Sequence, residues 1–180
     1  ATIIHIPVII ASLLMGPKKG GALGFLFGLT SFINNTINPS ATSFVFTPFY
    51  SLGEFSGGIG SVIICFIPRI LVGIVPYFVY KLVLRLSSET TKNRGVSNIG
   101  LVLAGISGAL VNTLLVMNLI YIFFGDAYIK ASEKAVSLGY MVILSIIGIN
   151  GVPEAIIAGI LTLCIGKVLL KKNVRERLGF

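Results

Sequence analysis

Charged and metal-binding side chains are scarce in this chain of 180 residues. Only 11% of the residues are charged and only six are acidic, whereas about a quarter of the residues of an average soluble domain are charged. This scarcity excludes an ordinary cytosolic enzyme and a disordered segment. The one histidine, His5, argues against a histidine-based metal site. The two cysteines, Cys65 and Cys164, lie inside apolar runs and predict neither a disulfide framework nor a thiolate metal site.

Motifs of catalysis and nucleotide binding are missing as well. The sequence contains no G-x-S-x-G and no H-E-x-x-H motif, and Gly159–Lys167 lacks the glycine spacing and the Ser or Thr of a Walker A loop. We therefore predict no catalytic residues, no bound metal and no cofactor in this chain, so that any ATP hydrolysis belongs to another protein. The net charge of +8 does not indicate nucleic acid, because the basic residues stand between long apolar runs and not in one patch.

The chain is rich in long apolar runs, and its mean hydropathy is +0.99. The runs cover residues 3–15, 20–33, 58–86, 98–124 and 151–171. The last three reach the roughly 20 residues that a membrane-spanning helix needs. The first two are shorter and are separated by a turn at Gly16–Lys19, which predicts a short helical hairpin in the membrane. We expect an all-α integral membrane protein with a single transmembrane domain, residues 1–180, and five spans.

Two longer connections remain, at residues 34–57 and 125–150. The second begins polar and turns apolar from Leu138 to Ile149. That apolar part has about a dozen residues, too few for an independent span. It fits an interfacial or re-entrant helix, or an extension of the last span.

The basic residues orient the spans, because cytoplasmic loops of membrane proteins carry an excess of Lys and Arg. With the turn at Lys18 inside the cell, eleven of the fourteen basic residues are cytoplasmic, as is the C-terminus, and both longer connections are extracellular. The first residue then lies outside, with no cleavable signal ahead of Ile3. We therefore expect a further helix upstream and six spans in all. An intact mass near 19.1 kDa with Ala1 as the true start would contradict this expectation.

Arg69 is the most unusual residue of the spans. It lies about 16 Å below the outer end of its helix, at about 1.5 Å per residue. A charge near the bilayer centre costs several kcal/mol and is normally paired or functional. Two roles are open and compatible: an ion pair with Glu154, or a binding site for a carboxylate, which a guanidinium can hold with two hydrogen bonds.

The segment Asn150–Glu154 has the pattern of a helix start. Asn150 can cap the helix, Pro153 suits the first turn, and Glu154 lies at the positive end of the helix dipole. A capped helix explains these residues without a ligand. A helix N-terminus also binds anions and polar groups, so ligand contact is the alternative.

Amides in and beside the spans are further candidates. For Asn112, which shares a helix face with Gly108, we expect a hydrogen bond to a ligand, with an interhelical hydrogen bond as the alternative. For Asn118 we expect the interhelical hydrogen bond. Asn34 lies at the outer end of the second short run and is placed to cap a site there. His5 is interpreted as a structural hydrogen-bonding residue.

Small residues recur at a spacing of four, which lets membrane helices approach closely. The three stripes are Gly20, Gly24 and Gly28; Gly100, Ala104, Gly108 and Asn112; and Gly151, Ala155 and Gly159. We expect these stripes to pack within one bundle. A contact surface for a partner membrane subunit is the alternative.

Three segments of the chain resemble one known family. They are IHIPVIIASLLMGPKKGGALGFLFGLTSFINNT (Ile4–Thr36), FIPRILVGIVPYFVYKLV (Phe66–Val83) and NGVPEAIIAGILT (Asn150–Thr162). They resemble the substrate-binding S components of energy-coupling factor (ECF) transporters. The pattern H-I-P-x-x-I followed by L-x-G-P-K-x-G is typical of the broad vitamin branch of the family, and within that branch the chain is most similar to the pantothenate-specific subunit.

The resemblance implies a six-helix bundle that binds a vitamin near the outer surface. It also implies assembly with a transmembrane T subunit and with two cytosolic ATPases, which use ATP and Mg²⁺, in the bacterial plasma membrane. The first helix of the family, with its A-x-x-x-A surface, has no counterpart in this sequence.

The resemblance also implies roles for the candidate residues. With pantothenate as the vitamin, Arg69 binds the carboxylate, and Asn112 and Asn150 bind the amide and hydroxyls. Phe46 and Tyr50 contact the apolar part of the molecule. The residues themselves suggest that Glu154 holds Arg69 until an anion arrives. The loop at residues 34–57, with Asn34, is then expected to close over the site as a lid.

Other functions remain open at this point. Within the family, the vitamin can be folate, riboflavin, hydroxymethylpyrimidine or pyridoxine, and a neutral ligand would leave Arg69 a structural residue. From another class, a stand-alone channel or secondary transporter would move its substrate without an ATPase. A purely structural membrane subunit would bind no ligand.

Overall fold

The computed structural model describes residues 4–52, 55–87, 96–131 and 140–170. Its α-helices are α1 (His5–Met15), α2 (Pro17–Ile37), α3 (Ile59–Val72), α4 (Val75–Leu86), α6 (Asn98–Ala131), α7 (Tyr140–Ile146) and α8 (Val152–Leu169). A π-helical turn, η3 (Ile147–Gly151), joins α7 to α8. Between α2 and α3 lie a 3-10 turn, η1 (Ser43–Val45), and two short antiparallel strands, β1 (Ser51–Leu52) and β2 (Phe55–Ser56). The predicted helical membrane fold is confirmed, with this small hairpin as its one addition among the described residues.

Three stretches are long and apolar enough to cross a membrane: Ile59–Leu86, Asn98–Gly125 and Tyr140–Leu169. The first two agree with the runs at residues 58–86 and 98–124. Inside the first stretch the helix is interrupted between α3 and α4, where Pro76 stands in the first turn of α4. A proline has no N–H to donate to the carbonyl four residues earlier, so a helix is easily broken just before it.

The short hairpin of α1 and α2 is also present, with a longer second helix than the run at residues 20–33. The chain turns at Gly16, whose φ of 87° is a backbone conformation that glycine adopts without steric cost. Pro17 then occupies the first position of α2, where its fixed φ suits a helix start. Lys18 therefore lies in the first helical turn and not in the loop before it.

The last span begins at Tyr140 and not at residue 151, so the predicted loop at residues 125–150 is largely helical where it is described. At its start, α6 continues to Ala131 after a kink at Phe124. At its end, α7, η3 and α8 form one continuous helical stretch, which is the extension of the last span that the sequence had left open. The prediction of a helix start capped by Asn150 is wrong, because the backbone at Gly151 is helical (φ −69°, ψ −36°) and no side chain caps α8.

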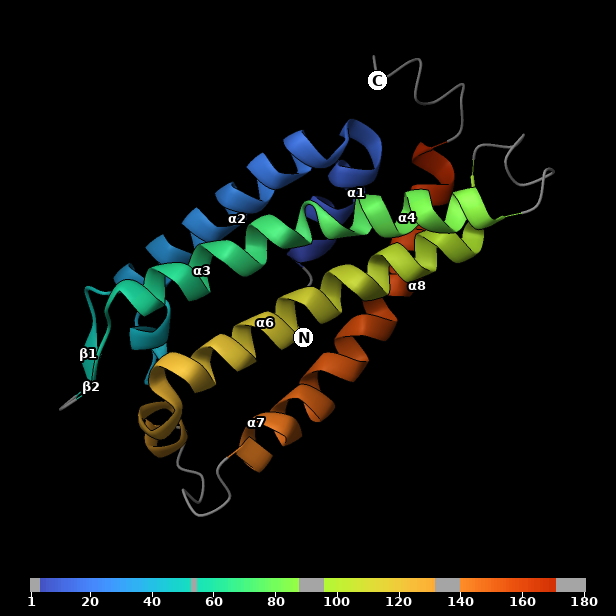
Figure 1. Cartoon of the computed structure of the whole chain (residues 1–180). Coiled ribbons are helices and arrows are strands. Elements are labelled where there is room, and N and C mark those ends of the chain that lie inside the picture. The colour runs from blue at the N-terminus through green and yellow to red at the C-terminus, as the bar shows by residue number, and fades with distance from the viewer. Residues whose placement is uncertain (1–3, 53–54, 88–95, 132–139, 171–180) are drawn as a thin grey trace.

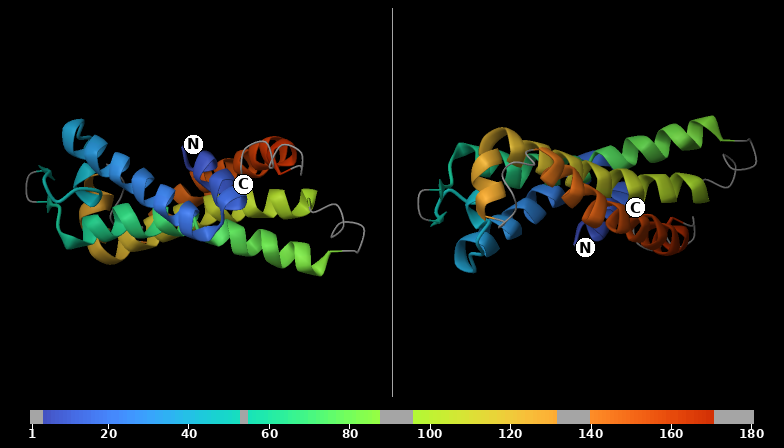
Figure 2. Two further views of the ribbon diagram at one scale, coloured as in Figure 1. Left: turned by 90° about the horizontal axis from the view of Figure 1, so that it is seen from above. Right: turned by 90° about the horizontal axis from the view of Figure 1, so that it is seen from below.

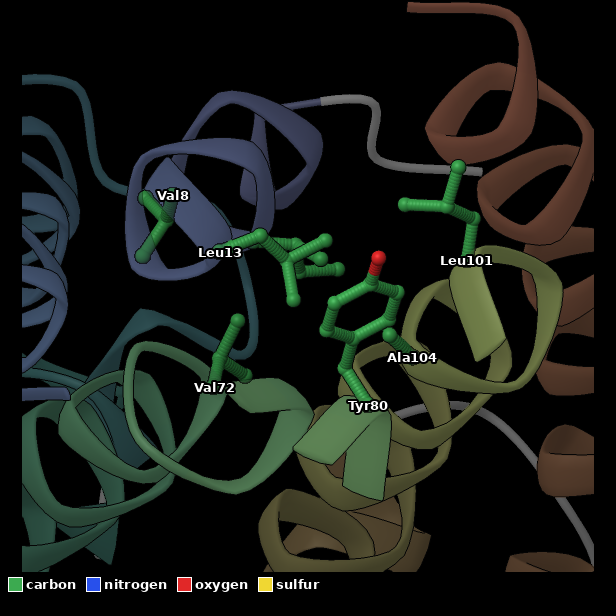
Figure 3. Packing of buried hydrophobic residues seen from close by; sticks show 7 residues of the cluster. Val8, Leu13, Val72, Tyr80, Leu101 and Ala104 are labelled. Carbon is green, nitrogen blue, oxygen red and sulfur yellow. The ribbon is translucent and has the colours of Figure 1, made fainter. Parts of the chain in front are cut away.

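The helices form an elongated bundle around α1. Helix α2 lies along α3, α6 lies along α3 and α4, and α8 lies along α6 (Figure 1). The strands and the kinked end of α6 lie together at one end of the bundle (Figure 2). The short helix α1 contacts five other helices. Its Val8 and Leu13 pack in a buried cluster with Val72, Tyr80 and Leu101 (Figure 3), so α1 is a core element.

The three stripes of small residues are used inside this bundle. A Cβ at Gly24 would collide with the backbone carbonyl of Arg69, a Cβ at Gly108 would collide with the Ile9 side chain, and a Cβ at Gly159 would lie 3.1 Å from Ile106. Each stripe thus lets two described helices approach closely, as expected for small residues in membrane helices. The packing interpretation is confirmed, and these faces are not available as a partner surface.

Candidate functional site

The position of Arg69 in the bundle follows from the helices on either side of it. Ile64 shares a buried cluster with Val116, and Pro76 lies against Gly108. Helices α3 and α4 therefore run antiparallel to α6. Arg69 stands between Ile64 and Pro76 in the chain, so it lies at the level of Asn112, which stands between Gly108 and Val116.

Glu154 and His5 lie at the same level. Gly151 lies against Thr113, and Gly105 lies against Ala158, so α8 runs antiparallel to α6 and places Glu154 about one turn from Asn112. The imidazole Nδ1 of His5, at the start of α1, is 3.3 Å from Oε1 of Glu154, and both residues are buried. Four helices thus bring His5, Arg69, Asn112 and Glu154 into one layer, which we call the polar layer.

The guanidinium of Arg69 is buried, with 7% of the residue exposed, and is held by its own helix. Nη1 donates a hydrogen bond of 2.8 Å to the carbonyl oxygen of Ile64. In an α-helix this carbonyl would accept from the N–H of residue 68, but residue 68 is Pro68, inside α3, and proline has no N–H. The side chain of Arg69 therefore takes the place of the missing backbone donor.

Two aromatic rings flank the guanidinium. Its Cζ atom lies 5.2 Å from the ring centre of Phe46, in the loop between α2 and α3, and 5.8 Å from the ring centre of Phe27 on α2. Both distances lie within the range of cation–π attraction. These rings give the buried cation partial compensation and supply an apolar wall beside it.

Two polar atoms of the layer have no hydrogen-bond partner among the described residues: Nε of Arg69 and Oδ1 of Asn112. Both atoms are fully buried. A buried polar atom without a partner costs about 1–3 kcal/mol, and native proteins leave few of them. A donor and an acceptor in one layer are suited to a ligand that has both an acidic group and a hydroxyl or amide N–H.

The expected partner of Glu154 is Arg69, but the structure places the carboxylate beside His5. Its Oε1 lies 3.3 Å from Nδ1 of His5, while Glu154 acts on Arg69 electrostatically. The pair with His5 fixes the start of α1 against α8. His5 is thus a structural polar residue, in agreement with its interpretation from the sequence, although its position puts it in the same layer as Arg69.

The loop between α2 and α3 is fastened to the ends of both helices. Ser61 of α3 donates a hydrogen bond of 2.6 Å to the carbonyl of Phe44, and the hydroxyls of Thr36 and Thr47 lie 2.7 Å apart. Phe46 and Tyr50 pack against the buried cluster beneath the loop. This geometry carries Phe46 to Arg69 and places the loop over this end of the bundle, where a lid would lie.

Two predicted site residues are exposed and do not belong to the buried polar layer. Asn34 is exposed on α2, and its Oδ1 accepts a weak hydrogen bond of 3.4 Å from Asn38. Asn150 is exposed in η3. Asn118 takes its expected structural role, because Tyr140 of α7 donates a hydrogen bond of 2.8 Å to its Oδ1.

Sequence reasoning did not identify Phe27 or Pro68. A signal was available for each of them. Phe27 stands beside Gly28 on the glycine face of α2 that packs on α3. Pro68 directly precedes the only charged residue of α3, and an interior proline always frees a carbonyl four residues earlier.

Replacing Ser61 with alanine is expected to loosen the loop. The change removes the hydrogen bond to Phe44 and the one that Ser61 Oγ accepts from the Gly58 N–H at 3.0 Å, at about 1 kcal/mol for each bond. Amide hydrogen exchange of residues 43–47 should become faster, with exchange in α6 unchanged. Ser51→Ala, at an exposed position of the same loop, is the matched control. Unchanged exchange at residues 43–47 would contradict the anchoring role of Ser61.

Comparison with known proteins finds a matching family and related proteins of known name. Residues 1–166 match the family described as ECF transporter, substrate-specific component. The pantothenic acid transporter PanT of Lactococcus lactis subsp. cremoris (strain MG1363) is 42% identical over 171 residues, which cover 94% of this chain and 78% of that protein. The pantothenate transporter PanT of Leuconostoc mesenteroides subsp. mesenteroides (strain ATCC 8293) is 30% identical over 187 residues, which cover 99% of this chain and 78% of that protein.

Proposed function

Because the chain belongs to the family of ECF transporter substrate-specific components, we propose that it binds pantothenate and that the polar layer is its binding site. The observation that carries the proposal is the pair of unpartnered buried atoms, Arg69 Nε and Asn112 Oδ1. One is a cationic donor and the other a neutral acceptor. Pantothenate offers the matching groups, a carboxylate for the first and hydroxyl and amide hydrogens for the second.

Each part of the vitamin has a partner of suitable chemistry. The carboxylate accepts hydrogen bonds from Nε and the terminal nitrogens of Arg69, with the geometry that favours guanidinium over ammonium. The amide and hydroxyl groups bind Asn112. The two methyl groups pack against Phe27, Phe46 and Tyr50, in keeping with binding sites that are mostly apolar and hold a few placed polar groups.

Glu154 serves this site indirectly. Its carboxylate offsets the charge of Arg69 before the vitamin arrives, because Glu154 lies close enough to act on Arg69 and is itself buried. When the vitamin binds, its carboxylate becomes the nearer partner of Arg69, and Glu154 stays with His5. Asn34 and Asn150 belong to the exposed rim, where they contact the vitamin only if the loop and η3 move inward.

Transport requires other chains. We propose that this subunit associates with the T subunit and with the two cytosolic ATPases of the ECF module, which bind ATP and Mg²⁺, while this chain binds only the vitamin. Lys18 and the C-terminus face the cytoplasm of the bacterial cell, in line with the distribution of basic residues. The end of the bundle that carries the strands then faces outward, with the loop at residues 34–57 as its lid.

Binding by the purified chain tests the proposal. Pantothenate is expected to raise the thermal stability of the detergent-solubilised protein, because a ligand that binds only the folded state stabilises it, by about 2.7 kcal/mol at 100 times Kd. Riboflavin, folate and hydroxymethylpyrimidine should give no shift at equal concentration. A larger shift with one of these vitamins, or none with pantothenate, would reject pantothenate as the substrate.

Reconstitution tests the need for partners. Proteoliposomes that hold this chain together with the T subunit and the ATPases should accumulate radiolabelled pantothenate when ATP is enclosed. Proteoliposomes with this chain alone should not. Uptake by the chain alone would instead support a stand-alone channel or secondary transporter.

A further inference from the structure

The hydrogen bond that holds Arg69 depends on the residue before it. Ile64 has a carbonyl available for the guanidinium because Pro68 cannot donate to it, and Nη1 of Arg69 donates to it at 2.8 Å. We propose that Pro68 is a positioning residue of the vitamin site, which fixes the guanidinium in place before the ligand arrives. The inference rests on the proposed role of Arg69 as the carboxylate-binding group.

The placement of the prolines supports this role. Pro17 and Pro76 stand in the first turns of α2 and α4, where a missing N–H breaks no helical hydrogen bond. Pro68 lies in the interior of α3, where proline removes a hydrogen bond and destabilises the helix. It lies directly beside the only buried arginine among the described residues. The destabilising proline is thus found where its freed carbonyl has a use.

A guanidinium that is already ordered before binding increases the affinity for the ligand. An arginine side chain has several rotatable bonds, and ordering them on binding weakens affinity. With Nη1 fixed on Ile64 and the rings of Phe27 and Phe46 on its flanks, the guanidinium is already ordered. Nε, which is buried and has no partner among the described residues, then remains available to the ligand.

The substitution Pro68→Ala separates this role from a purely structural one. Alanine restores an N–H that competes with Arg69 for the Ile64 carbonyl, so the guanidinium loses its anchor while the helix gains a hydrogen bond. The thermal stability of the ligand-free protein should stay equal or rise. The Kd for pantothenate should rise about tenfold, the weight of one hydrogen bond to a charged group. The Kd for pantothenol, in which an alcohol replaces the carboxylate, should not change.

Two controls complete the design. Pro76→Ala makes the same chemical change in the first turn of α4 and should leave both Kd values unchanged. In an Arg69→Ala background, Pro68→Ala should have no further effect on pantothenate binding, because a positioning residue acts only through the group that it positions. If Pro68→Ala does not fold, Pro68→Ser restores the same N–H and must show the same pattern.

The outcomes distinguish the two proposals. If the wild-type chain binds no pantothenate, the proposed function is wrong. If wild type binds, Arg69→Ala weakens binding and Pro68→Ala retains full affinity, only the positioning role of Pro68 is wrong. An equal loss of pantothenate and pantothenol binding in Pro68→Ala also overturns it, because that pattern indicates general damage to the bundle.

Discussion

Replacing Arg69 with alanine is expected to weaken pantothenate binding by about a hundredfold, while pantothenol binding changes little. The sequence alone supported a loss of at least tenfold. The structure supports the larger value because the guanidinium is buried, and each hydrogen bond between a charged group and a carboxylate contributes about 1.5–3 kcal/mol. Two such bonds correspond to at least a hundredfold in Kd. Isothermal titration of both ligands measures the change and its dependence on the carboxylate.

Two further variants show that the effect belongs to this guanidinium. Lys81→Ala removes one positive charge from an exposed position on α4 and should leave both Kd values unchanged. Arg69→Lys keeps the charge but lacks the planar fork that binds a carboxylate with two hydrogen bonds, so its affinity should fall between wild type and Arg69→Ala. A wild-type Kd in Arg69→Ala would show that the vitamin's carboxylate binds elsewhere.

The helical spans could be predicted from hydropathy because each is long and almost free of charge. The start of the last span was harder to predict. Asn150, Gly151 and Pro153 together have the composition of a helix start, yet the helix continues through them with a π-helical turn. Local preferences for turns are weak beside the need to satisfy backbone groups in an apolar environment, and that need keeps Tyr140–Leu169 helical.

Two residues of the candidate site could also be predicted from the sequence. Arg69 and Asn112 stand out in the sequence because polar side chains are costly in an apolar span, and the structure brings these two to one level. The energetic cost of a polar side chain in a span does not indicate which residue it contacts, so the contact between Glu154 and His5 could not be predicted. Asn34 lies near the end of α2 and Asn150 lies in the π-helical turn η3, and both are exposed, where an amide is inexpensive. Phe27 is one of many apolar residues, and its place beside Gly28 indicates packing on α3 but not contact with the guanidinium.

Replacing Gly24 with alanine is expected to destabilise the bundle by about 3 kcal/mol, the upper part of the range for overpacked sites. The added Cβ would collide with the Arg69 carbonyl and lie 2.9 Å from the Ile70 Cα. These are backbone atoms, so no side chain can move aside, and α2 must separate from α3. At roughly 2–4 °C per kcal/mol for a chain of this size, the Tm should fall by roughly 6–12 °C.

The same substitution separates two roles for the glycines of α2. A stripe that served as a partner surface would give a Gly24→Ala protein that is stable and binds the vitamin but fails to assemble. A stripe that packs within the bundle gives an unstable protein with weakened binding, since the displaced carbonyl belongs to Arg69 itself. Gly148→Ala, where a Cβ meets nothing within 4 Å, is the matched control and should keep the wild-type Tm. A Gly24→Ala protein as stable as this control would contradict the close approach of α2 and α3 on which the position of Arg69 depends.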